Sequence, residues 1–191
     1  MKENQRIAVT KRMLQEGLLR LLRTQPIDKI KVTELCEESG INRATFYRHY
    51  SLPRDVLDEV RRTVLQELQS CVRRASAFGG PRKGLEAICQ YCYNHGEALE
   101  ILFECHTDDG FAQFLNEFYQ ENLQEFRSIS RELHMDNEEM LLVSCYYGGG
   151  IYYILRQWLT GKIAKSPAQL ADLIYALITA RKMDAGEKYT H

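Results

Sequence analysis

A cluster of basic, aromatic and small side chains about a quarter of the way along the chain has the chemistry of a surface that contacts nucleic acid. Arg43 can donate two hydrogen bonds to O6 and N7 of a guanine, and the small side chain of Ala44 allows close backbone approach or contact with a thymine methyl group. Tyr47 and His49 suit hydrogen bonds to phosphate oxygens, which set register without reading sequence. Together with Arg48, they predict a face directed at a polyanion.

Two short helices joined at a glycine must hold this cluster. We expect the first helix over 33–38, with Thr33 as its N-cap and Gly40 at its end. The second helix is predicted over 43–49, with Asn42 as its N-cap. This arrangement is a helix-turn-helix, whose second helix can lie in a major groove.

The inner face of this helix pair is apolar, as a packed module requires. It is expected to bury against a preceding helix over 7–23, and it consists of Leu35, Ile41, Phe46 and Tyr50. A helix–glycine–helix segment also occurs in ordinary helical bundles, but the basic outer face favours nucleic acid.

The charge of the chain is distributed unevenly. Residues 1–63 contain 13 Lys and Arg and 9 Asp and Glu, a net charge of +4, whereas the remaining residues contain 12 and 17, a net charge of −5. The whole-chain value of −1 therefore conceals a basic N-terminal third, which suits a polyanionic partner. Hydrophobic residues make up 45% of the chain, which excludes intrinsic disorder.

Helical spacing of apolar residues continues along the rest of the chain and predicts an all-α fold. Pro53 suits the first turn of a long helix, and Asp55 favours the positive end of that helix. The run from Phe78 to Pro81 is the clearest break. Further helices are expected over 82–93, 95–106, 109–132, 138–159 and 167–182.

The segment from about Thr10 to Leu57 resembles the DNA-binding domain of TetR-family (TetR/AcrR-like) transcriptional regulators. The resemblance is carried by the runs IKVTEL at 30–35 and GINRATFYRHY at 40–50. The runs YYGGG at 146–150, WL at 158–159 and SP at 166–167 resemble a C-terminal domain found in a subset of that family. The resemblance implies a helix-turn-helix domain over 1–53 and a dimerising, effector-binding helical bundle over 54–191.

By position, the resemblance also assigns roles in DNA contact. Thr33 would touch phosphate through its hydroxyl and the helix N-terminus. The residues Arg43, Ala44 and Thr45 would face bases, and Tyr47 and His49 would hold phosphates. The predicted DNA-binding set is Thr33, Asn42, Arg43, Ala44, Thr45, Tyr47, Arg48, His49 and Arg54. One departure concerns the family's phosphate-contacting Lys at the start of the fourth helix, where this chain has Pro53, so that Arg54 is the candidate substitute.

Three consecutive glycines within the helix expected over 138–159 indicate a close helix–helix approach, because each glycine costs a helix about 1 kcal/mol relative to alanine. We expect this approach at a homodimer interface, with packing inside one chain as the alternative. The predicted interface residues are Gly148, Gly149, Ile151, Leu155, Trp158, Leu173, Ile174 and Leu177.

Aromatic residues in the second half suit a small-molecule pocket between bundle helices, although an aromatic stripe is also typical of plain core. The candidate pocket residues are Tyr91, Tyr93, Phe103, Phe114, Phe118 and Tyr147.

The cysteines offer a metal or redox alternative. Cys89, Cys92 and His95 lie three residues apart, and Cys105 and His106 follow, which allows zinc binding or thiol sensing. Buried core cysteines are the favoured interpretation, because no second spaced pair completes a site. We therefore predict no metal and no cofactor, and reduced thiols in a cytoplasmic protein with no membrane span.

The sequence thus predicts a DNA-binding transcriptional regulator, a repressor that binds a palindromic operator as a homodimer and responds to an effector. The alternative is a TetR-like coactivator or regulator controlled by a protein partner, without a small-molecule ligand. An enzyme is not expected, because the chain lacks a Gly-rich phosphate loop, Gly-x-Ser-x-Gly and His-Glu-x-x-His.

Overall fold

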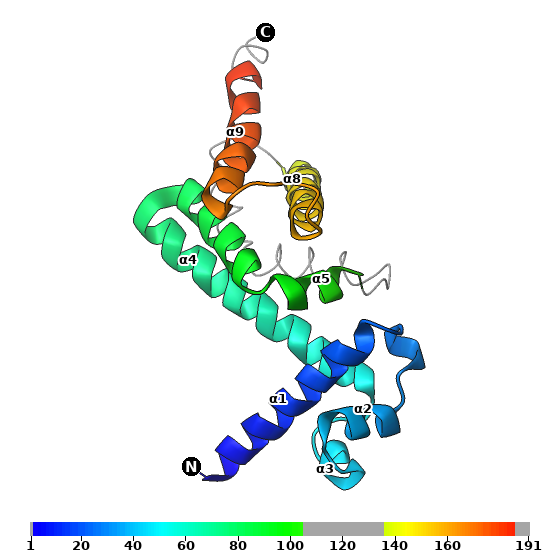
Figure 1. Ribbon diagram of the computed structural model, residues 1–191. Coiled ribbons are helices and arrows are strands. Elements are labelled where there is room, and N and C mark those ends of the chain that lie inside the picture. Colours follow the sequence, from blue (N-terminus) through cyan, green and yellow to red (C-terminus); the bar gives the residue numbers. More distant parts are fainter. Residues whose placement is uncertain (1, 105–135, 186–191) are drawn as a thin grey trace. The chain divides into compact units, whose positions relative to one another are not determined.

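All regular structure in the computed structural model, which describes residues 2–104 and 136–185, is helical (Figure 1). The all-α prediction is therefore confirmed. The elements are α1 (Lys2–Leu22), the 3₁₀ turn η1 (Ile27–Lys29), α2 (Val32–Ser39), α3 (Arg43–Tyr47), α4 (Pro53–Asn94), α5 (Gly96–Glu104), α8 (Asn137–Leu159) and α9 (Pro167–Ala185). No described helix is both long enough and apolar enough to cross a membrane.

The described residues form two compact units. The first contains residues 2–66 and 97–104, and the second contains residues 67–96 and 136–185. Helix α4 contributes to both units, because the boundary between them falls within it.

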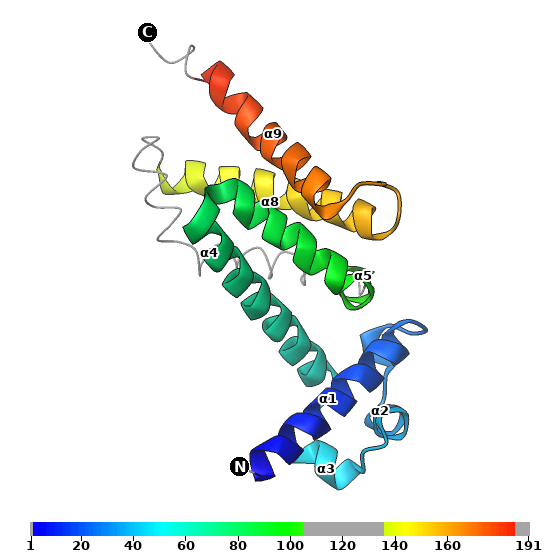
Figure 2. The ribbon, with the colours of Figure 1, turned by 60° about the vertical axis from the view of Figure 1, so that its left-hand side comes forward.

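The first unit is built around a single apolar core to which α1, η1, α2, α3 and the first turns of α4 contribute (Figure 2). Its buried residues are Leu14, Leu18, Ile27, Ile30, Leu35, Cys36, Phe46, Tyr50, Val56 and Leu57. Ile41 is half-buried and packs against them. The predicted inner face of the helix pair is therefore found where the periodicity places it.

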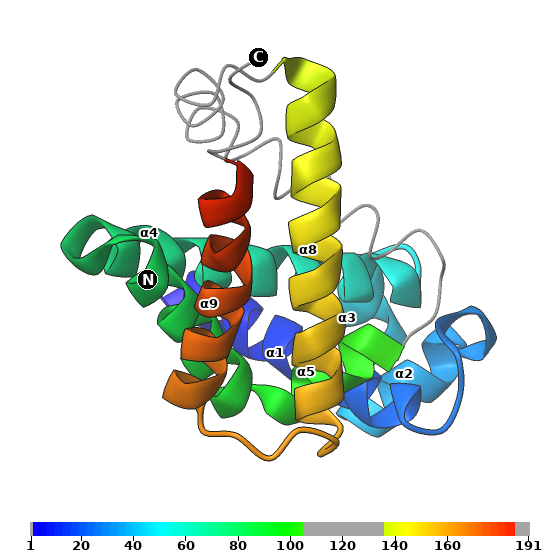
Figure 3. The same ribbon diagram turned by 90° about the horizontal axis from the view of Figure 1, so that it is seen from above.

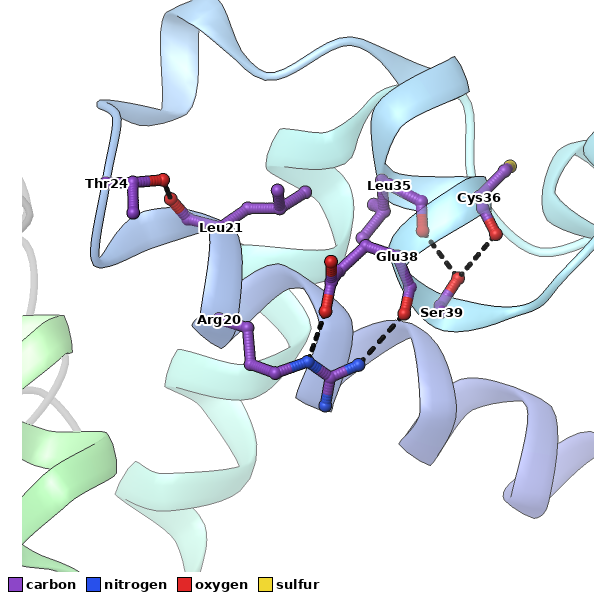
Figure 4. Close-up of polar contacts among 7 residues, drawn as sticks. All are labelled: Arg20, Leu21, Thr24, Leu35, Cys36, Glu38 and Ser39. Carbon is purple, nitrogen blue, oxygen red and sulfur yellow. Dashed lines mark hydrogen bonds and ion pairs between the residues drawn. The ribbon is translucent and has the colours of Figure 1, made fainter.

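A close approach and a polar clamp join α1 to α2 (Figure 4). A Cβ atom on Gly17 would lie 3.0 Å from the Cβ atom of Ser39, so glycine is the residue that allows this approach. The Ser39 hydroxyl is satisfied within α2, where it donates to the Leu35 carbonyl at 2.5 Å. Beside it, the Arg20 guanidinium bonds the Glu38 side chain and donates to the Glu38 carbonyl at 2.9 Å. These contacts hold α2 in place and so position the turn that follows it.

The turn between α2 and α3 uses two of the predicted residues. Gly40 has φ +68° and ψ 22°, the left-handed conformation that ends many helices. The Asn42 side chain accepts a hydrogen bond from the Thr45 backbone N–H at 2.8 Å, which confirms it as the N-cap of α3. Thr33 is not the N-cap of α2, because Lys31 occupies that position and Thr33 lies inside the first turn.

The break within α4 coincides with the predicted one. The backbone leaves the helical conformation at Gly79 (φ −149°, ψ 17°) and Gly80 (φ 69°, ψ −170°), and Pro81 lies directly after them. This divides α4 into a first arm over 53–78 and a second arm over 81–94. The Phe78 side chain at the break is 95% exposed.

The second unit connects its helices through a few specific contacts. Arg82 on the second arm of α4 forms an ion pair with Asp172 on α9. Trp158 stacks on Tyr93 with a centroid distance of 6.2 Å, and its indole N–H donates to the Lys165 carbonyl at 2.8 Å. The latter bond ties the end of α8 to the loop that leads into α9 (Figure 3).

Helix ends in this unit follow local capping chemistry. The Asp136 side chain accepts from the Glu139 backbone N–H at 2.8 Å and the Glu139 side chain accepts from the Asp136 backbone N–H at 2.8 Å, which fixes the start of α8. Ser166 and Gln169 form the same reciprocal pair at the start of α9, at 3.3 and 3.0 Å. The helix predicted over 109–132 lies outside the described residues.

Candidate nucleic-acid interface

Helix α3 presents its predicted outer face to solvent while its apolar side is fully buried. Phe46 is 0% exposed and anchors the helix in the core of the first unit. Tyr47, the next residue, is 52% exposed, and Ala44 and Arg48 are exposed as well. His49 is half-buried. Four residues of the predicted contact face are therefore accessible to solvent, namely Arg43, Ala44, Tyr47 and Arg48.

Arg43 is exposed at the first position of α3. No carboxylate among the described residues lies within ion-pair distance of its guanidinium. Burial raises the pKa of the nearby Cys36 thiol, whereas the positive charge of Arg43 acts to lower that pKa. Arg43 therefore offers a guanidinium with uncommitted donors at the end of α3 that would approach base edges.

The remaining predicted residues of α3 are tied to one another. The Arg48 guanidinium donates to the Thr45 hydroxyl at 3.1 Å, one helical turn away. The Asn42 side-chain oxygen is occupied by its capping bond, and Thr45 is half-buried. Asn42 caps the start of α3 and Arg48 lies at its end, where Arg48 is the charged residue of the three.

The N-terminus of α2 carries an acidic side chain beside Thr33. Thr33 is exposed, as a phosphate contact would require. However, the Glu34 carboxylate accepts from the Lys31 backbone N–H at 2.9 Å and already satisfies one of the free donors of this helix end. Exposed Lys31 supplies a positive charge at the same place.

The N-terminus of α4 has little capacity for a phosphate. Pro53 is buried and lacks an N–H, and the Asp55 carboxylate accepts from the backbone N–H groups of Ser51 at 2.7 Å and Leu52 at 2.8 Å. The Arg54 guanidinium forms an ion pair with Asp28 of η1 at 2.5 Å. The predicted substitute for the family's lysine is therefore engaged within the protein, and a carboxylate occupies the helix end.

A carboxylate network lies behind α3. Glu59 on α4 accepts hydrogen bonds from Lys11 on α1 at 2.8 Å and from the Tyr50 hydroxyl at 2.5 Å. Burial acts to raise the pKa of Glu59, but the bonds from Lys11 and Tyr50 and the charges of Lys11 and Arg62 outweigh it and lower that pKa. Burial and the bond to Glu59 raise the pKa of Tyr50, so this hydroxyl keeps its proton.

Three of the six predicted pocket residues have side chains that the structure describes, and these three differ in their surroundings. Tyr91 is buried, Tyr93 is 65% exposed and stacks on Trp158, and Tyr147 is half-buried. The side chain of Phe103, together with Phe114 and Phe118, lies outside the part of the chain that the structure describes.

A cleft of about 550 Å³ does include Tyr91. Its walls come from the two arms of α4 and the turn after them, and they are formed by Glu67, Ser70, Cys71, Arg74, Ala87, Gln90, Tyr91, Asn94 and His95. The Tyr91 hydroxyl donates to Glu67 at 2.8 Å, and the Tyr91 ring stacks on His95 with a centroid distance of 4.3 Å. Polar and charged side chains therefore form the walls of this cleft together with the Tyr91 ring.

The predicted interface residues divide into three groups. Leu155, Trp158 and Ile174 are buried within a single chain and belong to the core of the second unit. Leu173 and Leu177 on α9 are 49% and 63% exposed. The last group, Gly148, Gly149 and Ile151, is half-buried on α8. A Cβ atom on Gly149 would meet no described atom within 4 Å, so described residues of the same chain do not explain this glycine.

The cysteines of the second arm of α4 are buried thiols. Burial raises the pKa of Cys89 to about 11 and that of Cys92 to about 12, which keeps both protonated at neutral pH. His95 stacks on Tyr91, and the described residues contain no cluster of three metal-ligating side chains. Cys105 and His106 lie outside the described residues.

Sequence reasoning missed Lys11 and Glu59, as well as Asp28 as the partner of Arg54. Glu59 lies 48 residues after Lys11, and Asp28 lies 26 residues before Arg54, so no local spacing indicates either pair. The signal that was available is the tyrosine at position 50, because a buried tyrosine hydroxyl requires a hydrogen-bond partner.

Comparisons with known proteins agree with this architecture. The family model TetR_C_8, described as a transcriptional regulator C-terminal region, matches residues 80–180, which is more than half of the chain. No curated protein sequence matches the chain.

Solved structures with a similar fold cover nearly the whole chain. A protein assigned to the TetR-family transcriptional regulators, from Syntrophomonas wolfei, has a TM-score of 0.71 at 13% identity and covers 95% of this chain and 98% of its own. The TetR transcriptional regulator from Streptococcus agalactiae has a TM-score of 0.66 at 16% identity, with coverages of 93% and 98%. The dihydroxyacetone kinase operon activator DhaS has a TM-score of 0.60 at 19% identity, with coverages of 90% and 95%. At these identities the likeness shows a shared fold.

Proposed function

The chain belongs to the TetR family of transcriptional regulators, and from this premise we propose that it is a homodimeric repressor whose two helix-turn-helix units read the half-sites of a palindromic operator. As a member of that family it is a DNA-binding transcription regulator and not an enzyme. One observation carries the proposal: α3 exposes an uncommitted Arg43 guanidinium and Tyr47 above a fully buried Phe46.

The proposed division of labour follows the chemistry of each exposed group. Arg43 reads a guanine in each half-site, and Ala44 faces a neighbouring base. Tyr47 and His49 contact phosphates, and they set the register of α3 in the major groove. The engagement of Arg54 with Asp28 supports a contact surface confined to α2 and α3, without the start of α4.

The experiment is a selection of duplexes with a random 30-base-pair centre, followed by binding measurements at about 150 mM salt. We expect an enriched palindrome with half-site centres about one helical turn apart, because a two-fold protein presents two recognition helices. Failure to enrich any duplex over the starting library would overturn the proposal.

We propose that the dimer forms through α8 and α9. Support comes from Leu173 and Leu177, which are apolar and exposed in one chain, and from the open space beside Gly149. The buried members of the predicted set, Leu155, Trp158 and Ile174, are core residues of the same two helices.

A charge on α9 tests this interface. Leu177→Glu is expected to convert the dimer into a folded monomer in sedimentation, because an unpaired charge would be desolvated on association. Phe78→Glu is the matched control, since it also places a charge on an exposed apolar site, 95% exposed at the break of α4. A dimer that persists in Leu177→Glu, or dissociates equally in Phe78→Glu, would contradict the proposed surface.

We propose that an effector acts through the second unit and shifts the population of dimers whose recognition helices fit successive major grooves. The cleft beside Tyr91, with its mixture of aromatic, polar and charged groups, supports a small polar effector. A second candidate is a regulator controlled by a protein partner. The direction of control is a separate question, because DhaS, whose fold is similar, is an operon activator.

A reporter gene placed behind the enriched duplex separates the two candidates. Repression by the chain alone, relieved by a small molecule, is the expected result. Activation that requires a second protein would favour the alternative.

A further inference from the structure

One carboxylate joins three separate segments of the DNA-binding unit. Glu59 on α4 accepts from Lys11 on α1 at 2.8 and 3.1 Å, and from the hydroxyl of Tyr50, which lies between α3 and α4, at 2.5 Å. The Lys11 ammonium also lies 5.5 Å from the centroid of the Tyr50 ring. We call Lys11, Tyr50 and Glu59 the Glu59 network.

Tyr50 connects this network directly to the recognition helix. Its backbone N–H donates to the Phe46 carbonyl of α3 at 3.0 Å, and the two rings lie 5.9 Å apart. The His49 N–H donates to the same carbonyl at 2.9 Å. One residue therefore bonds α3 through its main chain and α4 through its side chain, so a shift of α4 is transmitted to the end of α3.

The polar groups of the network depend on one another. Tyr50 is 7% exposed, so its hydroxyl has little access to water and a missing partner would cost free energy. Glu59 supplies that partner, and the Lys11 ammonium compensates the charge of the partly buried carboxylate, whose side chain is 26% exposed. Loss of any one member leaves another without its partner, which favours a single arrangement of the three segments.

We propose that Tyr50 and Glu59 are positioning residues for DNA reading, which fix the orientation of α3 on α4 so that Arg43 and Tyr47 meet the two half-sites at the correct angle. The inference rests on the proposed function, because it needs sequence-specific binding by α3. It assigns a role in specificity to two side chains that do not themselves face the DNA surface.

The test compares two variants of the full-length protein that each lose one hydroxyl. Tyr50→Phe keeps the ring and removes only the hydroxyl that bonds Glu59. Thr160→Val is the matched control, because it keeps the shape of a half-buried side chain in the second unit and removes only the hydroxyl that donates to the Arg156 carbonyl at 3.0 Å. Both variants are measured well below their unfolding temperature, so that stability does not enter the comparison.

Tyr50→Phe is expected to lower affinity for the enriched palindrome about five- to tenfold, because DNA binding must then supply the ordering of α3 that the buried hydrogen bond supplies in the wild-type protein. Affinity for a non-specific duplex is expected to change less than about twofold with the same salt dependence, because phosphate contacts tolerate reorientation. Thr160→Val should leave both affinities unchanged. Unchanged specific affinity in Tyr50→Phe, or an equal loss in both variants, would overturn the inference.

Coupling between the two positions provides a second criterion. Glu59→Leu is expected to lower specific affinity to a similar extent, and the double variant Tyr50→Phe with Glu59→Leu should lose no more than either single variant. Additive losses would show that the two side chains act independently, and would contradict a common positioning role.

Amide hydrogen exchange tests the same inference without DNA. In Tyr50→Phe the amides of His49 and Tyr50 are expected to exchange at least about fivefold faster, because their bonds to Phe46 are no longer anchored to α4. Thr160→Val should leave their exchange unchanged. If the wild-type protein enriches no duplex, the proposed function fails, and the exchange rates alone decide on the coupling of α3 to α4: unchanged rates reject it.

Discussion

Two tyrosines donate to two glutamates of the same helix, one in each unit of the chain. Tyr50 bonds Glu59 at 2.5 Å and Tyr91 bonds Glu67 at 2.8 Å, and both tyrosines are 7% exposed. Burial, followed by the bond to the carboxylate, raises the pKa of each hydroxyl. The surroundings differ, because Lys11 completes the first pair, whereas the second borders a cleft. The Tyr50–Glu59 bond therefore involves a residue of the apolar core of the first unit, whereas the Tyr91–Glu67 bond lies at the wall of a cleft in the second unit.

This contrast extends to the apolar residues of the two units. The first unit collects ten buried residues in one cluster, with Phe46 at 0% exposure. The second unit leaves Phe78, Tyr153 and Leu177 more than half exposed, whereas the comparably exposed residues of the first unit, Tyr47 and Leu52, lie in α3 and just before α4. A contact surface that must present α3 at a fixed angle needs a core complete within one chain. A surface used for association instead keeps apolar area accessible. This contrast agrees with the proposed assignment of DNA reading to the first unit and of association to the second.

The largest expected effect of the contrast is on stability. Phe46→Ala removes a fully buried ring from the first unit and is expected to lower the free energy of unfolding by about 3–5 kcal/mol. Phe78→Ala, at a 95% exposed site, should change it by less than about 0.5 kcal/mol. Denaturant unfolding at fixed protein concentration measures both. Comparable losses in the two variants would refute the contrast.

Two glycines with positive φ provide the next comparison. Gly80 combines φ 69° with ψ −170°, a region open to glycine alone, so Gly80→Ala is expected to cost up to about 3 kcal/mol. Gly40 lies in the left-handed helical region, so Gly40→Ala should cost about 1–2 kcal/mol. Asparagine tolerates only the second conformation, so Gly40→Asn should restore stability and Gly80→Asn should not. Thermal unfolding of the four variants checks the order, and a rescue at position 80 would contradict it.

Local features of this fold could be predicted from the sequence because neighbouring residues determine them. Gly40 ends α2, Asn42 caps α3, and the break of α4 falls at Gly79 and Gly80, as the turn and capping chemistry indicates. Phe46 is buried, as the periodicity of the apolar residues predicts. Each of these outcomes depends on residues within one or two helical turns.

The features that sequence reasoning missed depend on partners far along the chain or on competition between similar groups. Thr33 was a reasonable N-cap of α2, but Lys31 holds the position and Glu34 bonds its N–H. The partner of Arg54 is 26 residues away at Asp28, so its ion pair could not be derived from helix spacing. Tertiary packing selected these pairs, and a single sequence contains no measure of that packing.

DNA contact offers a comparison between two arginines. Arg43→Ala in the first unit is expected to relax base preference at one position of each half-site and to cost about 1–3 kcal/mol of binding free energy. Arg82→Ala in the second unit removes an equal charge, but one paired with Asp172, and should leave base preference unchanged. Selection of duplexes by each variant measures the preference. A changed preference in Arg82→Ala would contradict the assignment of reading to the first unit.

The smallest expected effect concerns Glu59 and pH. Because its neighbours lower the pKa of Glu59 below the ordinary carboxyl value of about 4.3, its ionised form favours the folded state. That contribution is complete above the unfolded pKa and is lost as pH falls through the lower, folded pKa. At pH 7, Glu59→Gln should therefore reduce the free energy of unfolding by up to about 1 kcal/mol, and this difference should shrink as the pH falls below about 4.

Lys11→Met tests the cause of this pH dependence, because it removes the ammonium that bonds Glu59 and lowers its pKa. In the Lys11→Met background, the effect of Glu59→Gln should therefore depend less on pH than in the wild-type background. Unfolding curves from pH 3 to pH 7 give both differences. A wild-type advantage over Glu59→Gln that grows toward low pH would reverse the sign required by a lowered pKa. Equal pH dependence in the two backgrounds would mean that Lys11 does not lower the pKa of Glu59.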